Sequence, residues 1–214
     1  MVQNTPAKRG RPRAYDPATA LRQAMELFWS QGYAATSLDG LSEVTGMNRP
    51  SLYGAFGDKR ALYLRTLNEY RANGALAIGR ALALPTLRAG LAEFYRSALE
   101  LYLSGDSPRG CFLIGTAAVE AVQDEEVRTI LHGALADYDF MLEARMIKAR
   151  DEGELPADAD VTALAKIASA ALYSLAIRSR GGDSRENLEK TAAAAINLVC
   201  GRLVPSPLRG RGQG

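Results

Sequence analysis

Residues 37–57 read SLDGLSEVTGMNRPSLYGAFG, and the interpretation of the whole chain starts there. Thr36 with Asp39 three residues later matches a capping box, and Gly46 is a residue type that commonly ends a helix. Between these signals the apolar residues recur at steps of three, the spacing of a short amphipathic helix: Leu38, Leu41 and Val44. A first short helix is therefore expected before Gly46.

A second short helix is expected over residues 49–55. Asn48 can cap its start, and Pro50 stands in the first turn, where proline is tolerated. Two short helices joined by a glycine-containing turn indicate a helix-turn-helix, in which the second helix reads DNA. An ordinary helical hairpin closed by Gly46 is the alternative.

The next helix opens with cations in its first turn, Lys59 and Arg60 after Asp58. The helix macrodipole disfavours positive charge at this end, and an external phosphate beside the turn would reverse that effect. Lys59 is therefore a candidate contact to the DNA backbone, and the hydroxyl of Tyr53 is another.

Residues 11–63 resemble the DNA-binding region of the TetR/AcrR family of one-component transcriptional regulators. The family pattern runs F-x-x-x-G-Y-x-x-T-S, L-x-x-x-x-G, S-L-Y-x-x-F and D-K-x-x-L, and it appears here in that order in residues 28–37, 41–46, 51–56 and 58–62. The resemblance implies an all-α fold, with an N-terminal three-helix helix-turn-helix domain followed by a helical-bundle ligand-binding and dimerisation domain. It also implies a homodimeric repressor that binds a palindromic operator in double-stranded DNA and answers to an unknown small-molecule effector.

With this resemblance, the expected DNA contacts fall into three groups. The second helix would meet the major groove, residues before the first helix together with Lys59 would hold phosphates, and the basic N-terminus would enter the minor groove. The contacts are Arg49, Ser51, Leu52 and Tyr53, with Asn48 at the helix start, for the major groove; Thr36, Ser37 and Lys59 for phosphates; and Arg9, Arg11 and Arg13 for the minor groove.

The composition is that of an ordinary globular protein: 214 residues, 47% hydrophobic and 23% charged. The net charge of +2 hides an asymmetry, because seven cations and no acids lie in residues 1–13 and 202–214, against 19 basic and 24 acidic residues between them. No uninterrupted apolar run approaches the roughly 18 residues of a membrane span, and no apolar segment follows the basic N-terminus as in a secretory signal. With two cysteines as well, a reducing cytoplasm without membrane contact is expected.

Four segments are expected: a disordered basic arm (1–13), a helix-turn-helix DNA-binding domain (14–62), a regulatory and dimerisation domain (63–203) and a disordered tail (204–214). Within the arm, KRGRPR resembles the core of an AT-hook, whose arginines lie in a narrow A·T-rich minor groove. A generic basic tail that adds non-specific phosphate affinity is the alternative.

Apolar periodicity predicts further helices on both sides of the motif. Before the motif it gives residues 16–31, where Trp29 is interpreted as a core residue. After the motif it gives residues 58–80, 86–104, 111–122, 124–152, 160–178 and 184–203. Residues 111–122 are apolar nearly all round and are expected at the centre of the regulatory domain.

The last two predicted helices are the expected dimer interface. Small residues line residues 160–178, and the family resemblance implies that these helices pair with their copies into a four-helix bundle, with Cys200 packed there. The alternative is that they face only this chain's own core.

Cys111 is a candidate for the residue through which the regulator senses its effector. It follows Arg109 and starts a short helix, and a guanidinium and a helix N-terminus both stabilise a thiolate. A reactive thiol would make Cys111 a sensor of electrophiles or oxidants, as the resemblance implies for some family members with G-C-F-L at this point. The alternative is a small buried hydrophobic residue.

The other expected signal is a small molecule bound among aromatic side chains from several helices, a usual place for an apolar pocket. The same side chains could instead be plain core. The candidates are Tyr70, Phe94, Tyr95, Tyr102, Phe112, Tyr138 and Phe140.

The sequence favours a DNA-binding regulator over an enzyme. It has one histidine, His132, and lacks a phosphate-binding glycine loop, a nucleophile elbow and metal-ligand spacing, so no catalytic residue, cofactor or metal is expected. The alternative function is a helical small-molecule-binding or interaction protein whose DNA-binding head is vestigial.

Overall fold

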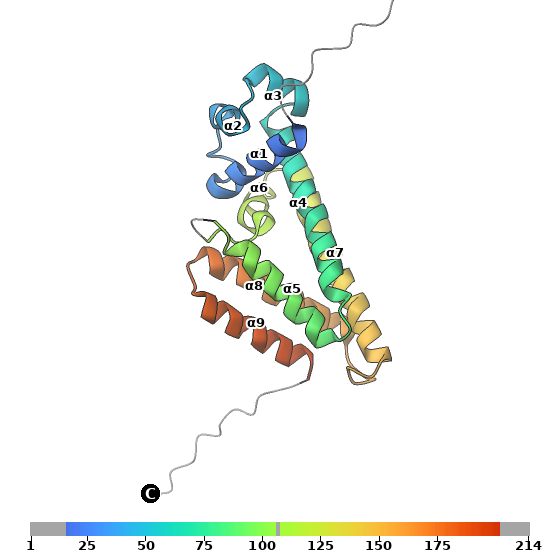
Figure 1. Ribbon diagram of the computed structural model, residues 1–214. Helices are drawn as coiled ribbons and strands as arrows, with labels where there is room; N and C mark the ends of the chain where they lie inside the picture. The colour runs from blue at the N-terminus through green and yellow to red at the C-terminus, as the bar shows by residue number, and fades with distance from the viewer. Residues whose placement is uncertain (1–15, 106–107, 202–214) are drawn as a thin grey trace, which may run out of the picture. The chain divides into compact units, whose positions relative to one another are not determined.

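The computed structural model describes residues 16–105 and 108–201, and these residues form helices and their connections without a strand. The all-α fold class is thereby confirmed. The chain divides into two compact units after Thr66, which we call the head and the body. Helix α4, Lys59–Leu82, is continuous through this division (Figure 1). The functional domain boundary expected after residue 62 stays a prediction.

The head contains the three predicted helices, and a side chain caps the N-terminal end of each. Asp16 accepts backbone N–H groups at the start of the first, and Asn48 accepts the N–H of Ser51 at the start of the third. Gly46 ends the second in the left-handed conformation (φ 62°), which glycine adopts without steric cost. The helices are α1 Pro17–Gln31, α2 Leu38–Thr45 and α3 Arg49–Phe56 (Figure 1).

The start of α2 differs from the predicted capping box. Ser37, not Thr36, is the N-cap, because its hydroxyl oxygen accepts the N–H of Gly40. Thr36 is buried, and its hydroxyl donates to the carbonyl oxygen of Gly32 at 2.7 Å. The carboxylate of Asp39 pairs with Arg49 rather than with the end of its own helix.

The core of the head is aromatic. Phe28 and Tyr63 pack edge to face with ring centroids 5.1 Å apart, and Tyr33 lies 4.7 Å from Tyr63. Trp29 is 2% exposed, which confirms its interpretation as a core residue. Such packing gives the short helices α2 and α3 a stable base, since isolated helices of this length are marginal in water.

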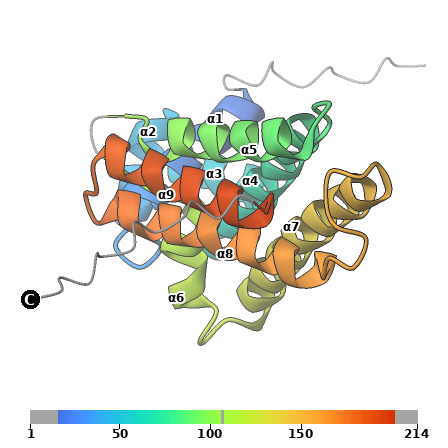
Figure 2. The same ribbon diagram turned by 90° about the horizontal axis from the view of Figure 1, so that it is seen from below.

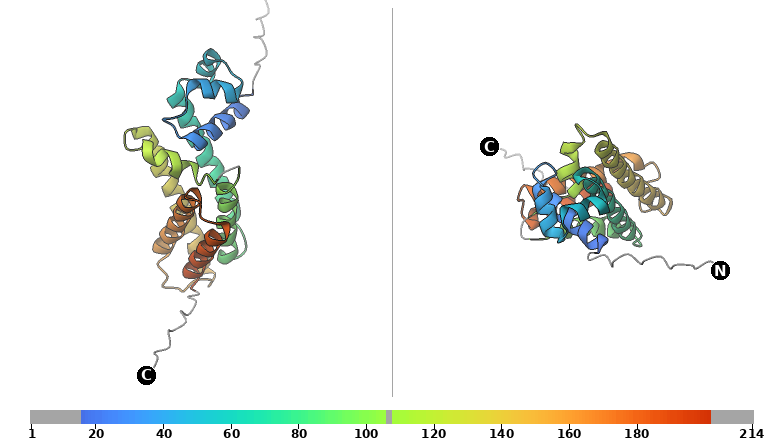
Figure 3. Two further views of the ribbon diagram at one scale, coloured as in Figure 1. Left: turned by 90° about the vertical axis from the view of Figure 1, so that its left-hand side faces the viewer. Right: turned by 90° about the horizontal axis from the view of Figure 1, so that it is seen from above.

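The body is a bundle of longer helices. Helices α5, α8 and α9 lie side by side when seen from below (Figure 2), and Figure 3 shows α8 and α9 adjacent, in orange and red. Helix α7 packs against α8. Besides the later part of α4, the long helices are α5 Leu87–Tyr102, α7 Glu125–Asp151, α8 Val161–Arg180 and α9 Arg185–Val199.

The predicted short helix at 111–122 is only partly as expected. It forms a π-helical turn, η1 Leu113–Ala117, followed by α6 Ala118–Glu120. Phe112 and Leu113 are buried, but Val119 and Val122 are 68% and 74% exposed, so the second half is not central. The prediction of a wholly buried segment was wrong because composition alone does not say where a segment leaves the bundle.

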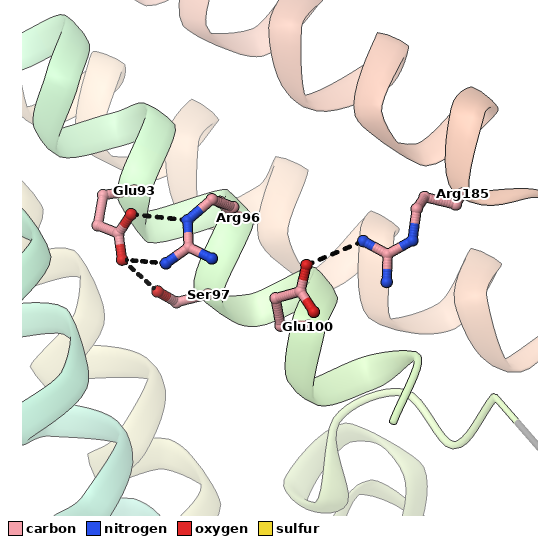
Figure 4. A network of polar contacts seen from close by, with 5 residues as sticks. All are labelled: Glu93, Arg96, Ser97, Glu100 and Arg185. Atoms are coloured by element: carbon pink, nitrogen blue, oxygen red, sulfur yellow. Dashed lines mark hydrogen bonds and ion pairs between the residues drawn. The ribbon is translucent and has the colours of Figure 1, made fainter. Parts of the chain in front are cut away.

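Charged side chains join α5 to the start of α9. Glu93 binds Arg96 through both carboxylate oxygens and also accepts the hydroxyl of Ser97, and these hydrogen bonds lower the pKa of Glu93 to about 2. One turn further on, Glu100 meets Arg185 at 3.0 Å (Figure 4). Arg96, Glu100 and Arg185 are exposed, so these ion pairs add little to the stability of the fold.

Helix α8 has the length and composition of a membrane-spanning helix, with a mean hydropathy of 1.3 over its most apolar window. It nevertheless packs against α5, α7 and α9, and its buried side chains include Ala165, Ala168, Leu172 and Leu175. A core helix of a bundle buries its apolar face in this way without a membrane.

Candidate nucleic-acid interface and thiol site

Helix α3 presents alternating buried and exposed side chains. Leu52 and Phe56, one turn apart, are 3% and 4% exposed and fix the helix on the head, whereas Tyr53 is 47% exposed and Arg49 is exposed as well. Leu52 is therefore an anchor in the core, and its predicted contact with the major groove is corrected. Arg49, Tyr53 and the half-exposed Ser51 lie where a ligand of the head could meet them.

The predicted phosphate contacts around α2 and α4 separate into two kinds. Thr36 is buried and bonded to Gly32, so the structure does not support its hydroxyl as a phosphate contact. Ser37 is exposed, although its oxygen caps α2. The ammonium of Lys59 lies 4.4 Å from the ring centroid of Tyr33 and 3.4 Å from the carbonyl oxygen of Ala34. The ring of Tyr33 and the carbonyl oxygen of Ala34 therefore stabilise the positive charge of Lys59 at the start of α4. The sequence prediction gave that role to a phosphate.

A close ion pair joins α2 to α3. The Nε and Nη2 atoms of Arg49 lie 3.0 and 2.6 Å from Oδ1 of Asp39. The side chains are 54% and 77% exposed. The sequence pattern did not predict this contact, because a capping box would place Asp39 at the start of its own helix. The predicted minor-groove residues Arg9, Arg11 and Arg13 lie outside the described residues.

In the body, the thiol of Cys111 is surrounded by hydrogen-bond donors. The hydroxyl of Tyr70, on α4, donates to Sγ at 3.5 Å, and the hydroxyl of Tyr102, at the end of α5, also reaches the sulfur. The backbone N–H groups of Leu113 and Ile114 point to it from the following turn. Cys111 is 6% exposed, so most of these interactions are shielded from water.

Burial raises the pKa of the Cys111 thiol above its usual value, and the hydrogen bonds from Tyr70, the backbone and Tyr102 offset only part of that rise. The guanidinium of Arg109 donates to the hydroxyl of Ser104 at 2.9 Å. The expectation of a lowered pKa was therefore wrong: the helix N-terminus does reach the sulfur, but desolvation outweighs it. Cys111 as the sensor stays a prediction.

The predicted aromatic set divides between several places. The hydroxyls of Tyr70 and Tyr102 hydrogen-bond to Cys111, Tyr138 lies near enough that a charge on the sulfur would raise its pKa, and Phe112 packs on Tyr70 with centroids 5.6 Å apart. Tyr173 of α8 joins this group and was missed, because the sequence analysis placed only apolar residues on the inner face of α8. We call these residues the Cys111 cluster: Tyr70, Tyr102, Cys111, Phe112, Tyr138 and Tyr173.

The remaining aromatic candidates lie elsewhere. Phe94 packs against Tyr95, whose hydroxyl donates to the carbonyl oxygen of Ala168 at 2.9 Å, so Tyr95 joins α5 to α8 as part of the core. Phe140 is 72% exposed on α7, and its place in an interior pocket is corrected.

A pocket of about 360 Å³ opens beside Cys111. Gly115 forms part of its wall, and the guanidinium of Arg180 lies so close to Gly115 that a Cβ there would collide with it. Gly110 (φ 64°) approaches the carbonyl oxygen of Ala176 in the same way. Arg180 was missed as a site residue, since nothing in the sequence around it marks it. The pocket is lined by Cys111, Ile114, Gly115, Ala176, Ile177, Arg180 and Gly181.

Other reactive groups form no comparable site. Among the described residues, no three His, Cys, Asp or Glu side chains come together as metal ligands would. His132 is exposed on α7. Cys200, at the end of α9, is half-buried, and burial raises its pKa as well.

Comparison with known proteins accounts for both units. Residues 20–66 match the family described as bacterial regulatory proteins, tetR family, and residues 83–195 match the tetracyclin repressor-like C-terminal domain. The HTH-type transcriptional repressor ComR of Escherichia coli is 31% identical over 192 residues, which cover 89% of this chain and 91% of ComR. The repressor BdcR of the same organism is 28% identical over 193 residues, which cover 89% of this chain and 92% of BdcR.

A solved structure agrees with these relatives. It contains a cysteine mutant of the TetR family transcriptional regulator CifR together with a 26-base-pair operator duplex. This chain is 33% identical to it with a TM-score of 0.76, over 87% of this chain and 98% of the other.

Proposed function

The chain belongs to the TetR family of DNA-binding transcriptional regulators, and from that premise we propose that it is a homodimeric repressor. It binds a palindromic operator through α3 and leaves it when a small molecule binds or modifies the body at the Cys111 cluster. It acts in the cytoplasm and catalyses no reaction.

The exposed face of α3 carries the DNA-binding part of this proposal. Leu52 and Phe56 hold the helix on the head, so Arg49 and Tyr53 project outward from a rigid support. Asn48 caps the start of the helix, and Ser51 stands beside them. A capped helix anchored on one face and polar on the other suits the major groove, where a recognition helix reads base edges with its N-terminal residues. Ser37 and Lys59 remain the proposed phosphate contacts.

Exposed apolar side chains on the last two helices support a dimer. Ile167 and Ile177 on α8 are 40% and 62% exposed, and Leu198 on α9 is 49% exposed. A second copy packed on α8 and α9 would remove these side chains from water, and a two-fold protein is what a palindromic operator requires. The palindrome itself follows from the family and from this symmetry.

The Cys111 cluster supports the proposed control of release. Tyr70 belongs to α4, the same continuous helix that begins at Lys59 in the head. An adduct on Cys111 would need the space that the hydroxyls of Tyr70 and Tyr102 now share with the sulfur. The cluster would then have to repack, and a displacement of α4 would favour the state of the dimer that binds DNA less well. A pocket lined in part by Cys111, Gly115 and Arg180 lies next to the sulfur.

Fluorescence anisotropy tests the proposal directly. The reduced protein is titrated onto labelled DNA from upstream of its own gene and onto a scrambled duplex, at two salt concentrations. A specific complex binds the upstream DNA at least about a thousandfold more tightly than the scrambled duplex. The titrations are repeated after treatment with a maleimide on the parent, on Cys111→Ser and on Cys200→Ser, which removes the other thiol as a matched control.

We expect specific binding in all three proteins and its loss after maleimide in the parent and in Cys200→Ser only. Loss in Cys111→Ser as well would move the modification elsewhere. Unchanged binding in all three would leave a non-covalent ligand of the cluster as the signal. Equal affinity for the two duplexes, strongly salt-dependent, would favour the alternative of an interaction protein with a vestigial head.

A further inference from the structure

The pair between Asp39 and Arg49 is an unusual arrangement for a surface that meets DNA. Asp39 lies in the first turn of α2 and Arg49 begins α3, ten residues later in the chain. Both side chains are exposed, so the pair adds little to the stability of the head. A carboxylate beside a DNA-reading helix also repels phosphates, so its presence there calls for a compensating role.

The geometry of the pair leaves one edge of the guanidinium available. Asp39 accepts from Nε and from Nη2 with the single oxygen Oδ1. Arginine has five N–H donors in one plane, so the second N–H of Nη2 and both N–H groups of Nη1 are left on the far edge. Guanine offers two adjacent acceptors, N7 and O6, in the major groove, and a pair of parallel N–H donors fits them.

We propose that Asp39 is a positioning residue that holds Arg49 to read a guanine in each half-site of the operator. This inference rests on the proposed function and names one base that the recognition helix selects. Asp39 restricts the rotamers of Arg49 before binding, so less conformational freedom is lost on the DNA. It also neutralises much of the arginine charge, which favours base reading over a phosphate contact.

Adenine at the same position would be rejected. It keeps the N7 acceptor but presents the N6 amino group where guanine has O6, so one arginine N–H would face another donor. The discrimination therefore depends on the orientation of the guanidinium plane, and Asp39 fixes that orientation.

The experiment selects DNA with the full-length protein. A pool of duplexes randomised over about thirty base pairs, enough for two half-sites one or two helical turns apart, is bound and sequenced. The parent is compared with Asp39→Asn, Arg49→Ala, the double variant and Glu43→Gln. Glu43 is another exposed carboxylate of α2, so Glu43→Gln removes the same charge without touching the pair. Circular dichroism melting confirms that each variant is folded.

We expect the parent to select a G·C pair at symmetric positions, and Arg49→Ala to lose that preference while other positions keep theirs. Asp39→Asn should weaken the same preference by about three- to tenfold and leave the others unchanged, and the double variant should match Arg49→Ala at that position. Glu43→Gln should select like the parent.

Several results would overturn the inference. One is a loss of affinity for all sequences alike in Arg49→Ala, as a phosphate contact would give. Another is an equal rise in affinity in Asp39→Asn and Glu43→Gln, which would make Asp39 only a repulsive charge. If the parent enriches no sequence at all, the proposed function fails together with this inference, whereas enrichment without a guanine preference refutes the inference alone.

Discussion

Two arginine–carboxylate pairs, one in each unit, have similar lengths and different surroundings. Arg49 and Asp39 in the head meet at 2.6 Å with side chains 54% and 77% exposed. Arg145 and Glu154 in the body meet at 2.8 Å with side chains 4% and 23% exposed. Water screens the first pair and leaves its outer N–H groups free to bind a ligand, whereas the second pair holds α7 to the start of α5. The two ion pairs therefore differ in solvent exposure and not in length, and exposure decides whether an arginine can still reach a ligand.

The largest effect is expected from breaking the buried pair. Glu154→Gln leaves the charge of Arg145 buried without its partner and should cost about 3 kcal/mol of unfolding free energy. Glu152→Gln is the matched control, because the side chain of Glu152 is 50% exposed and forms a looser ion pair with Lys148, at 3.8 Å. Urea unfolding followed by circular dichroism measures both variants. Equal losses would show that burial does not decide how much these two ion pairs contribute.

The same pair predicts a pH dependence. Burial raises the pKa of Glu154, but the hydrogen bonds from Arg145 and from the N–H of Leu87 outweigh it, so the pKa lies below its usual value. A lowered carboxyl pKa stabilises the fold above the unfolded-state pKa of about 4.3, and this stabilisation is lost as the pH falls through the folded value. The difference between parent and Glu154→Gln should therefore shrink toward pH 3.

The Cys111 thiol extends the comparison to a buried group that can react. Because its raised pKa keeps the thiol protonated at neutral pH, maleimide modification should accelerate steadily between pH 7 and pH 9, as the thiolate fraction grows with pH. Mass spectrometry of quenched samples measures the rate, with Cys111→Ser as the background. A rate that is flat across this range would mean that the thiolate is already formed at pH 7.

A smaller effect is expected from a buried hydroxyl. Tyr70→Phe removes the donor to Cys111 Sγ and should cost about 1 kcal/mol of unfolding free energy. It should also slow the maleimide reaction, since losing the donor raises the pKa of the thiol further. Tyr53→Phe, on the exposed face of α3, should change neither quantity. If the two variants behave alike, the Tyr70 hydroxyl has no special role at the sulfur.

The smallest effect on stability is expected from the exposed pair. Asp39→Asn should change the unfolding free energy of the head by less than about 1 kcal/mol. The single tryptophan, Trp29, lies in the core of the head and reports its unfolding by fluorescence. A loss above about 2 kcal/mol would make Asp39 a structural residue and remove the contrast with Glu154.

Much of the fold could be predicted because its signals are local. Asp16 and Asn48 fix helix starts through hydrogen bonds within three residues, Pro17 favours the first turn of α1 through its fixed backbone angle, and Gly46 ends α2 through its own backbone conformation. The prediction failed at Thr36, where two neighbouring hydroxyl residues compete for one cap. A pattern shows that a cap is near, but the backbone decides which residue takes it.

The functional surfaces could be predicted only in part. Arg49 and Tyr53 are exposed on α3 as expected, but Leu52 is core and Phe140 is exposed. Helical periodicity gives the angle between side chains on one helix, and the neighbours of that helix decide which angle faces inward. Arg180 carries no sequence signal at all, because its place follows from the missing side chain of Gly115.

The sequence by itself determined that this chain is an all-helical regulator with a helix-turn-helix head, since those features depend on contacts within a few residues and on a spaced family pattern. Only the tertiary structure decided that Asp39 holds Arg49 and that Cys111 is a buried thiol beneath Tyr70. Tyr70 and Cys111 are 41 residues apart. Partners at such distances, and the desolvation that sets a pKa, exist only once the helices have packed.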